Sequence, residues 1–334
     1  MDDRSRHRWA EMLDGLAGLL PAGSRRVLVD GPADRASLFT AQLTERLAVR
    51  GCPVVVSGDA DAARDVSIFL RTAPSRRWPE APGPGRAGAQ GRPEVPGGER
   101  DDHDRREREA RADIVIDLHD VGWPVIRRVT ARLAASGSWY LTETRAFFGC
   151  RAATWDAKFG HDIPAYRAAV AVAGIRRGGV VVDVGCGTGR ALAPLRDAVG
   201  QVGAVIALDV TPEMLAAARP ASAVAGAARV LADARALPLR DGSADAIFAA
   251  GLVNHLPDTE AGLRELARVI RSGGKLVLFH PSGRAALAAR HGQALSPDEP
   301  LAEGPLRRST RASGWTLTAY DDAPHRFFAL AERR

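Results

Sequence analysis

Three alternating glycines mark the segment of this sequence that is best arranged for ligand chemistry. Residues 183–189 read DVGCGTG, follow an apolar run typical of a buried strand, and lead directly into a helical stretch. Glycines allow a sharp strand-to-helix turn and let a ligand approach the backbone, while the helix N-terminus offers amide donors. The segment therefore predicts a site for a nucleotide-like ligand. Its candidate binding residues are Asp183, Gly185, Cys186, Gly187 and Gly189.

The spacing of these glycines distinguishes between classes of nucleotide. A dinucleotide fingerprint requires G-x-G-x-x-G, and its third glycine would fall at position 190, where Arg190 stands. The segment instead has the form D-x-G-x-G-x-G. We therefore expect a ligand other than a dinucleotide.

Two further carboxylates follow the next two expected strands. Asp209 comes after Asp183 near the distance, roughly 20 residues, at which a Rossmann-like fold places its ribose-binding carboxylate. Asp233 lies at the end of the strand expected at 228–234, where a carboxylate can accept the amino group of an adenine. Thr211 suits a helix N-cap and Pro212 a first helical position. Neighbouring candidates are Val210, Ala234 and Met214, the last of these against the adenine.

Two histidines are the candidate catalytic residues. His255 follows the strand expected at 244–251, and His280 lies at the end of the strand expected at 275–281. Ligands of open parallel sheets bind at the carboxyl ends of strands, and histidine exchanges protons near neutral pH. Each is therefore a candidate base for a substrate hydroxyl or amine. The alternative for each is a histidine that caps a loop.

Strands and helices alternate throughout the second half of the chain, which specifies a doubly wound parallel sheet. Residues 314–322 and 325–333 are expected to form a β-hairpin that closes the sheet antiparallel. The other expected strands are 179–185, 204–210, 228–234, 244–251 and 275–281, and the expected helices are 165–174, 191–200, 212–219 and 259–270.

These elements together resemble the class I S-adenosylmethionine-dependent methyltransferases. The resemblance rests on the glycine loop, Asp209, Asp233 and the segments 245–258 and 266–276, which follow one another in the family's order. The nearest branch is methyltransferase type 11, akin to the quinone-biosynthesis methyltransferases. The resemblance implies a Rossmann-like seven-stranded sheet with an antiparallel last strand. Ser272 stands where this branch commonly has proline, which should alter only a turn.

The resemblance also implies S-adenosylmethionine as the cofactor and a small molecule as the acceptor. The glycine loop would hold the methionyl part, with Asp183 suited to the ammonium and the sulfonium, and Gly251 and Leu252 belong to the family's fourth segment. Trp155 is similar to an aromatic residue that folds over the cofactor; alternatively, it packs its helix onto the sheet together with Phe159. Because the cofactor carries the activated methyl group, an obvious catalytic residue is not required.

Other methyltransferase classes are disfavoured by what the sequence lacks. An [N/D]-P-P-[Y/F] segment, typical of enzymes that methylate amino groups of nucleic acids, is replaced by NHLP at 254–257, and no Pro-Cys nucleophile is present. Within the glycine loop, Cys186 is expected to be a small packing residue. The alternative to an enzyme is a non-catalytic S-adenosylmethionine-binding or scaffold protein.

The first half of the chain predicts a separate α/β domain over 1–145, before a methyltransferase domain over 146–334. Strands are expected at 25–31, 52–59 and 112–120 and a helix at 36–51, and the polar, proline-rich and glycine-rich stretch at about 74–111 is expected to be disordered. This half resembles P-loop nucleoside kinases such as uridine kinase. However, Ala36, Ser37 and Leu38 stand where Gly, Lys and Ser/Thr should be. We therefore expect a degenerate kinase-like domain without phosphoryl transfer.

Composition limits the remaining possibilities. The net charge is +6, but arginine provides almost all of the positive charge, so a nucleic-acid partner is not expected. Three scattered cysteines predict neither disulfides nor a metal site. No apolar run reaches the roughly 20 residues that cross a bilayer. These features predict a cytoplasmic protein without a membrane segment. They do not indicate an oligomeric state.

Overall fold

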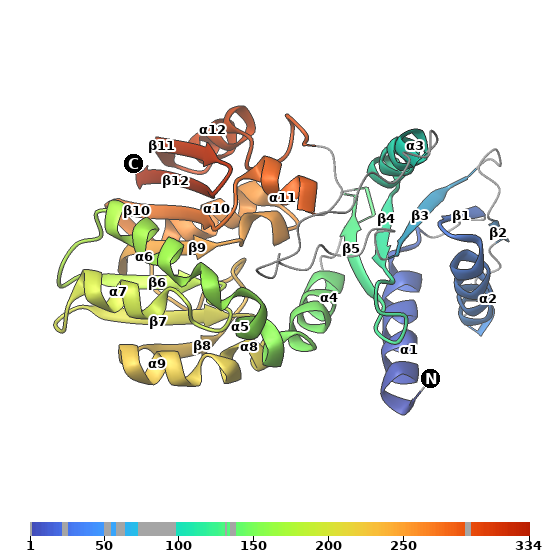
Figure 1. Cartoon of the computed structure of the whole chain (residues 1–334), viewed down its shortest axis with the longest axis horizontal. Helices are drawn as coiled ribbons and strands as arrows, with labels where there is room; N and C mark the ends of the chain where they lie inside the picture. Colours follow the sequence, from blue (N-terminus) through green and yellow to red (C-terminus); the bar gives the residue numbers. More distant parts are fainter. Residues whose placement is uncertain are drawn as a thin grey trace, which may run out of the picture. The chain divides into compact units, whose positions relative to one another are not determined.

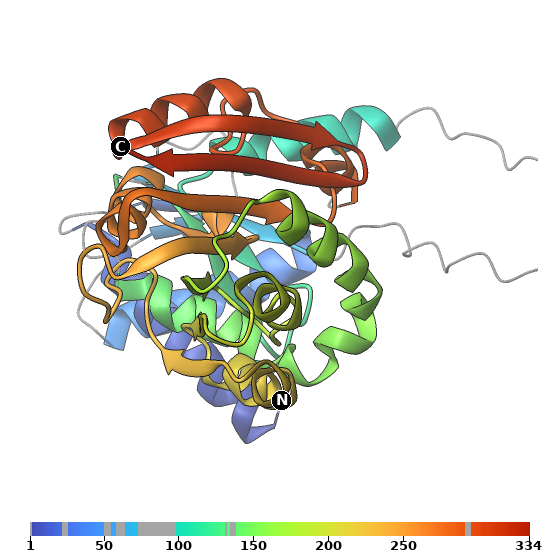
Figure 2. The ribbon, with the colours of Figure 1, turned by 90° about the vertical axis from the view of Figure 1, so that its left-hand side faces the viewer.

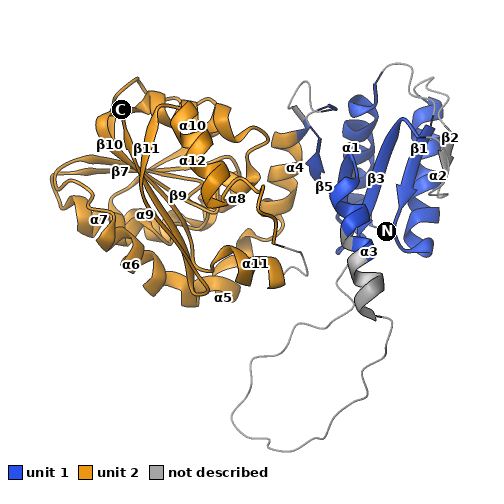
Figure 3. Ribbon diagram, turned by 90° about the horizontal axis from the view of Figure 1, so that it is seen from above, with its two compact units in different colours: residues 1–139 blue, residues 140–334 orange. Residues whose placement is uncertain are grey.

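The computed structural model describes residues 2–21, 26–49, 55–57, 64–72, 98–130, 132–133, 138–290 and 295–334. The chain forms two compact units, Met1–Trp139 and Tyr140–Arg334 (Figures 1 and 3). The boundary falls at the start of helix α4 (Ser138–Gly149). The predicted boundary after residue 145 therefore lies inside this helix, where the backbone is continuous.

Unit 1 has a five-stranded sheet in the order β2-β1-β3-β4-β5, in which only β5 runs antiparallel to its neighbour. Strands β3 and β5 were not predicted from the sequence. The elements are α1 (Asp3–Leu19), β1 (Arg26–Asp30), α2 (Ala33–Val49), β2 (Val55–Ser57), β3 (Val66–Arg71), α3 (Gly98–Arg111), β4 (Ile114–Asp117) and β5 (Val125–Val129).

Helices α1 and α2 form the main core of unit 1 with one face of this sheet. Trp9 and Met12 of α1 and Phe39 of α2 are buried in the same cluster as the strand residues Ile68 and Ile114. Side chains alternate between the two faces along a strand, so Phe69 and Val115 point to the other face. There they pack with Ala112, which follows α3.

The last part of the predicted disordered insertion is helical. Residues 98–111 form α3, whereas residues 74–97 lie outside the described residues. This helix has few apolar side chains, and ion pairs join it to the strand ends. Arg71 of β3 pairs with Glu109, and the Arg108 Nε lies 3.4 Å from the Asp30 Oδ2 at the end of β1. The disorder prediction was wrong for this part because composition does not report tertiary ion pairs.

The structure leaves no phosphate-binding loop after β1. This strand ends at Asp30 and α2 already begins at Ala33. The positions aligned with the essential Gly, Lys and Ser/Thr therefore lie inside a helix, where the Ser37 hydroxyl donates to the Ala33 carbonyl at 2.8 Å. Backbone amides in a helix are already paired and cannot cradle a phosphate.

Unit 2 has a seven-stranded sheet in the order β11-β12-β10-β9-β6-β7-β8, in which β12 runs antiparallel to both neighbours. Figure 2 shows the long β11–β12 hairpin beside β10. The strands are β6 (Val180–Val184), β7 (Ala204–Asp209), β8 (Ala228–Leu231), β9 (Ala244–Ala250), β10 (Ile270–His280), β11 (Trp315–Ala323) and β12 (Arg326–Arg333). This is the predicted Rossmann-like α/β arrangement.

Helices cover both faces of this second sheet. One face packs against α6, α7, α8 and α9, and the other against α10 and α12. Besides α4, the helices are α5 (Trp155–Phe159), α6 (Ile163–Val172), α7 (Leu192–Val199), α8 (Pro212–Ala217), α9 (Arg219–Ala225), α10 (Thr259–Val269), α11 (Arg284–Arg290) and α12 (Glu303–Ala312), with short 3-10 turns η1 (Ala152–Thr154), η2 (Gly160–Asp162) and η3 (Val253–His255). Within the described ranges, no helix is both long and apolar enough to cross a bilayer.

The strand order fixes where a ligand can bind. The chain runs outward from β6 through β7 to β8, then returns to place β9 on the other side of β6. A ligand of an open parallel sheet binds at such a switch point, outside the carboxyl ends of the strands. In unit 2 this point lies between β6 and β9, where the glycine loop begins.

Candidate functional site

The glycine loop turns sharply because three of its residues adopt positive φ. Gly185, Gly187 and Gly189 have φ of 75°, 54° and 89°. A side chain at Gly189 would collide with Leu192 and Ala221, whereas one at Gly187 would point into open space. Gly189 is therefore required for packing, and Gly187 leaves the backbone accessible to a ligand.

Asp209 ties this loop to the neighbouring strand. Its Oδ2 accepts the Gly187 N–H at 2.8 Å, and its Oδ1 accepts the Thr211 N–H, also at 2.8 Å. The side chain is largely buried. An ionised carboxylate offers about four lone-pair positions, so these two bonds leave room for about two further donors.

Asp183 is the most completely buried carboxyl of the site, at 1% exposure. No group among the described residues hydrogen-bonds its Oδ2. Burial raises the pKa of Asp183 to about 8, with the charge of Asp209 adding to the shift and Arg190 opposing it. A buried polar atom without a partner is costly, so this oxygen is suited to a donor supplied by a ligand.

In the loop after β8, the Asp233 carboxylate is paired with the guanidinium of Arg235. The Arg235 backbone N–H donates to Asp233 Oδ1 at 2.9 Å, and the guanidinium Nη2 donates to Oδ2 at 2.7 Å. Ala234 lies between them and is half-buried. Asp233 was predicted from the sequence and Arg235 was not, although aspartate commonly accepts a bond from the backbone two residues later.

His280 and Gly251 lie side by side at the ends of β10 and β9. A Cβ added at Gly251 would stand 3.9 Å from the His280 ring. The His280 Nδ1 lies 2.9 Å from the Ser282 carbonyl, and burial lowers the pKa of this imidazole, with Arg290 among the contributing charges. The ring is therefore neutral at pH 7, as a base requires. Leu252, the next residue, packs on the core.

His255 belongs instead to an aromatic cluster with Trp155. The Phe148 ring centroid lies 5.1 Å from His255 and 5.7 Å from Trp155, and Trp155 lies 4.8 Å from Phe159. The structure thus brings Trp155 and His255 together, with Phe148 between them. The two predicted histidines have different surroundings, because His280 lies beside Gly251 with its Nδ1 at a backbone carbonyl, whereas His255 packs against the Phe148 ring.

The short helix α5 is fastened to the glycine loop. The hydroxyl of Thr188, which is almost fully buried, donates to the Asp156 carboxylate at 2.5 Å. Arg190, at the end of the loop, donates to the Phe159 carbonyl at 3.2 Å. The helix that carries Trp155 is therefore held over the loop by bonds at both of its ends.

Helix α4, labelled in Figure 1, contacts the loops that follow β7, β8 and β9. Arg145 donates to the Val210 carbonyl at 2.9 Å after β7, and the Tyr140 ring lies against Arg235 after β8. Phe148 reaches His255 after β9. Met214 is buried in α8. Together, α4 and α5 cover the carboxyl edge at which the predicted residues gather, and periodicity alone gave no signal for these contacts.

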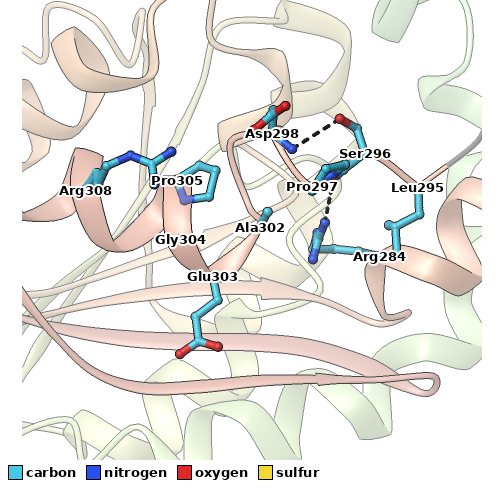
Figure 4. A pocket seen from close by; sticks show the side chains of 10 residues that line it. All are labelled: Arg284, Leu295, Ser296, Pro297, Asp298, Ala302, Glu303, Gly304, Pro305 and Arg308. Carbon is cyan, nitrogen blue, oxygen red and sulfur yellow. Dashed lines mark hydrogen bonds between the residues drawn. The ribbon is translucent and has the colours of Figure 1, made fainter.

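A separate surface hollow of about 530 Å³ lies beside α11 and α12 (Figure 4). Arg284 stands in its wall, and this guanidinium is paired with both Glu299 and Asp322. None of the residues that line the hollow belongs to the strand-end loops described above. The lining residues are Arg284, Leu295, Ser296, Pro297, Asp298, Ala302, Glu303, Gly304, Pro305 and Arg308.

The part of unit 2 that forms the carboxyl edge of the sheet matches a known protein family. Residues 182–278, from β6 into β10, match the family described as a methyltransferase domain. Unit 2 contains a methyltransferase domain. The domain is of the S-adenosylmethionine-dependent class, so S-adenosylmethionine is its cofactor. The match spans the glycine loop and both carboxylates after it, and it ends inside β10, before His280.

Individual relatives resemble the methyltransferase domain over a limited length. An uncharacterized 37.1 kDa protein encoded in a Streptomyces fradiae transposon is 39% identical over 107 residues, which cover 32% of this chain and 31% of that protein. A demethylmenaquinone methyltransferase of Shouchella clausii is 36% identical over 111 residues, which cover 32% of this chain and 47% of that enzyme. The chain thus spans less than half the length of these relatives.

Solved structures resemble the chain over a larger part of its length. A methyltransferase structure from Aquifex aeolicus, described as dependent on S-adenosylmethionine, is 22% identical with a TM-score of 0.47. The likeness covers 56% of this chain and 98% of that one.

Proposed function

We propose that this protein transfers a methyl group from S-adenosylmethionine to a small-molecule acceptor at the carboxyl edge of the unit 2 sheet. The observation that carries the proposal is the buried Asp183 Oδ2, which lacks a partner among the described residues and lies beside an open glycine loop. A cationic ligand with N–H donors can donate a hydrogen bond to this oxygen and can occupy the space over the loop. The cofactor carries an ammonium and a sulfonium, and so matches this site.

The remaining residues have complementary roles in this proposal. Gly185, Gly187 and Gly189 admit the methionyl part, and Cys186 packs beneath it. Asp209 accepts the ribose hydroxyls with the positions that Gly187 and Thr211 leave open. Asp233 accepts the adenine amino group. Val210, Met214, Ala234, Gly251, Leu252 and Trp155 complete the apolar walls.

The chain's own catalytic contribution is orientation, exclusion of water and the acceptance of one proton. Bound S-adenosylmethionine supplies the activated methyl group. Helices α4 and α5 cover the site and keep water from the reacting centre. His280 is the better candidate base, because its Nδ1 is held by Ser282 and no described group bonds its Nε2. His255, packed against Phe148, is the second candidate.

Calorimetric titration of the full-length protein with S-adenosylmethionine tests the cofactor site. We expect micromolar binding that is weakened at least tenfold by Asp183→Asn. The matched control is Asp197→Asn, because Asp197 is an exposed carboxylate of α7 paired with Arg167. Absence of binding by the wild-type protein would overturn the proposal.

A second assay separates an enzyme from the non-catalytic alternative. Labelled methyl transfer is followed with a panel of phenols, hydroquinones, carboxylic acids and amines, and we expect at least one to be methylated. If the cofactor binds but no member is methylated, the result favours a non-catalytic S-adenosylmethionine-binding or scaffold protein.

We propose further that unit 1 is a degenerate kinase-like domain without phosphoryl transfer. The helical positions of Ala36, Ser37 and Leu38 and the ion pairs of Asp30 and Arg71 with α3 support this proposal. Titration of the same protein with Mg·ATP should give no heat of binding. A measurable ATP affinity with hydrolysis would contradict it.

A further inference from the structure

The carboxyl ends of β9 and β10 form the part of the unit 2 edge that the proposed cofactor leaves free. The glycine loop, Asp209 and Asp233 follow β6, β7 and β8, which are consecutive neighbours in one half of the sheet. Strands β9 and β10 lie on the other side of β6. We therefore expect the molecule that receives the methyl group to lie at the ends of β9 and β10.

Ser282, just after β10, connects His280 to Arg290. The His280 Nδ1 lies 2.9 Å from the Ser282 carbonyl oxygen and 3.1 Å from the Ser282 backbone nitrogen. The hydroxyl oxygen of this buried serine accepts a hydrogen bond from the Arg290 Nη2 at 2.7 Å. One residue thus contacts both side chains and fixes the guanidinium near the candidate base.

The first and last residues of α11 are both arginines, but their charges are balanced differently. Arg284, the first, pairs with both Glu299 and Asp322. Arg290, the last, is exposed and bonds to the neutral Ser282 hydroxyl. Within the described ranges, no carboxylate forms an ion pair with Arg290. Its positive charge is therefore available to a ligand.

The other arginine near His280 is already paired. Arg190 lies 3.4 Å from the Asp162 carboxylate, and its guanidinium carbon lies 4.8 Å from the centroid of the Tyr166 ring. Burial lowers the pKa of His280, the charges of Arg290 and Arg190 add to this effect, and Asp162 opposes it. Of these two cations, Arg290 is the one that an acceptor can reach without displacing a carboxylate.

The Arg290 guanidinium keeps most of its donors for such a ligand. An arginine has five N–H donors, and the bond to Ser282 uses one of them. The planar fork binds a carboxylate or a phosphate through two parallel hydrogen bonds. An anion bound here would also offset the positive charge of Arg290 and so make His280 a stronger proton acceptor.

We propose that Arg290 binds an anionic group of the acceptor, a carboxylate or a phosphate, while His280 receives the proton of the group that is methylated. The inference rests on the proposed function, because it places the acceptor at that same site. It defines the substrate class as small acids that carry a hydroxyl or an amine besides the anionic group. Arg290 is then the residue that distinguishes these acids from their neutral analogues.

Binding of small anions to the full-length protein, saturated with S-adenosylhomocysteine, tests the inference. The probes are benzoate, phenyl phosphate and neutral benzamide, each titrated while the imidazole signals of His280 are followed by NMR. Benzoate or phenyl phosphate should bind saturably and raise the pKa of His280, because the bound anion opposes the charge of Arg290. Benzamide should do neither. The tighter of the two anions identifies the group as a carboxylate or a phosphate.

Two variants of Arg290 and a matched control assign the anion to its site. Arg290→Gln should weaken anion binding at least tenfold and abolish the effect of the anion on the His280 pKa. Arg290→Lys, which keeps the charge but loses the fork, should be intermediate. The control is Arg308→Gln, because Arg308 is an exposed arginine in the wall of the separate surface hollow. It should match the wild type, and loss of binding in this variant instead would overturn the inference.

Methyl transfer to a matched pair of compounds tests the consequence for the substrate. Gallate and gallamide have nearly the same shape but differ in charge. Gallate should be methylated with a kcat/KM at least tenfold higher, and Arg290→Gln should remove this preference chiefly through KM. Equal values for the two compounds in the wild type would overturn the inference. If neither compound is methylated, the binding measurements decide.

The measurements separate failure of the inference from failure of the proposed function. If the wild-type protein does not bind S-adenosylhomocysteine, the cofactor proposal itself fails. If it does, but no anion changes the His280 pKa, the acceptor inference is wrong while the cofactor site stands. If Arg290→Gln weakens S-adenosylhomocysteine as much as it weakens the anion, Arg290 binds the carboxylate of the cofactor and the inference is overturned.

Discussion

Asp183 and Asp209 stand near the carboxyl ends of adjacent parallel strands, and the charge of Asp209 adds to the burial that raises the pKa of Asp183 to about 8. Backbone N–H groups of Gly187 and Thr211 stabilise the charge on Asp209. Asp183 has Arg190 as its opposing charge. Below pH 8 the pair therefore carries its negative charge mainly on Asp209.

This relationship predicts that cofactor binding releases a proton. Below pH 8 the Asp183 carboxyl is protonated in the free protein, and the cationic cofactor favours its ionised form. The affinity for S-adenosylmethionine should therefore rise by up to about tenfold per pH unit between pH 6 and pH 8 and then level off. Calorimetry in buffers of different ionisation enthalpy measures the released proton directly. A slope that persists in Asp183→Asn would assign the effect to another group.

Substitution of Gly187 should separate ligand binding from stability. Gly187 and Gly178 both have positive φ, 54° and 77°, and both face open space. Alanine at either position should cost about 1–2 kcal/mol of folding free energy through backbone strain. Only Gly187→Ala should also block the cofactor, with an affinity loss of at least tenfold. Chemical denaturation and calorimetry measure the two effects, and equal affinities for both variants would exclude the loop as the binding surface.

The bond between Thr188 and Asp156 should contribute to cofactor affinity by holding α5 over the glycine loop. Thr188→Val removes the hydroxyl at nearly constant volume, and we expect the affinity for S-adenosylmethionine to fall by about 1 kcal/mol, roughly fivefold. Thr188→Ser keeps the hydroxyl and should remain close to wild type. Trp155 fluorescence should report the loosened helix, and an unchanged spectrum and affinity in Thr188→Val would argue against this role.

His280 should remain neutral at a pH where an ordinary histidine is half protonated. Burial lowers its pKa, and the positive charges of Arg290 and Arg190 add to this effect. Arg290→Gln should therefore raise the His280 pKa. A pH titration followed by NMR of the imidazole signals, assigned with His280→Gln, measures both values. A midpoint at or above that of free histidine would remove the reason for preferring His280 as the base.

The parallel strands of the unit 2 sheet and the glycine loop could be predicted from local patterns in the sequence. The strands β6, β7 and β9 could be predicted because each is an apolar run flanked by turn residues or a helical pattern. The positive φ angles of the loop glycines follow from the residue type itself. Parallel strands bring their carboxyl ends to one edge, so Asp209 and Asp233 could be placed near Asp183 without coordinates.

Only the tertiary structure decided how these groups are paired and covered. Helix α3 is predominantly polar, and its ion pairs with Asp30 and Arg71 depend on strands distant in sequence. The ring of Tyr140 reaches Arg235, and Thr188 reaches Asp156, across similarly long separations. Periodicity reports which face of an element is apolar, but not which partner it meets. The sequence by itself therefore determined the cofactor edge, whereas the fold decided which carboxylates are free to bind a ligand.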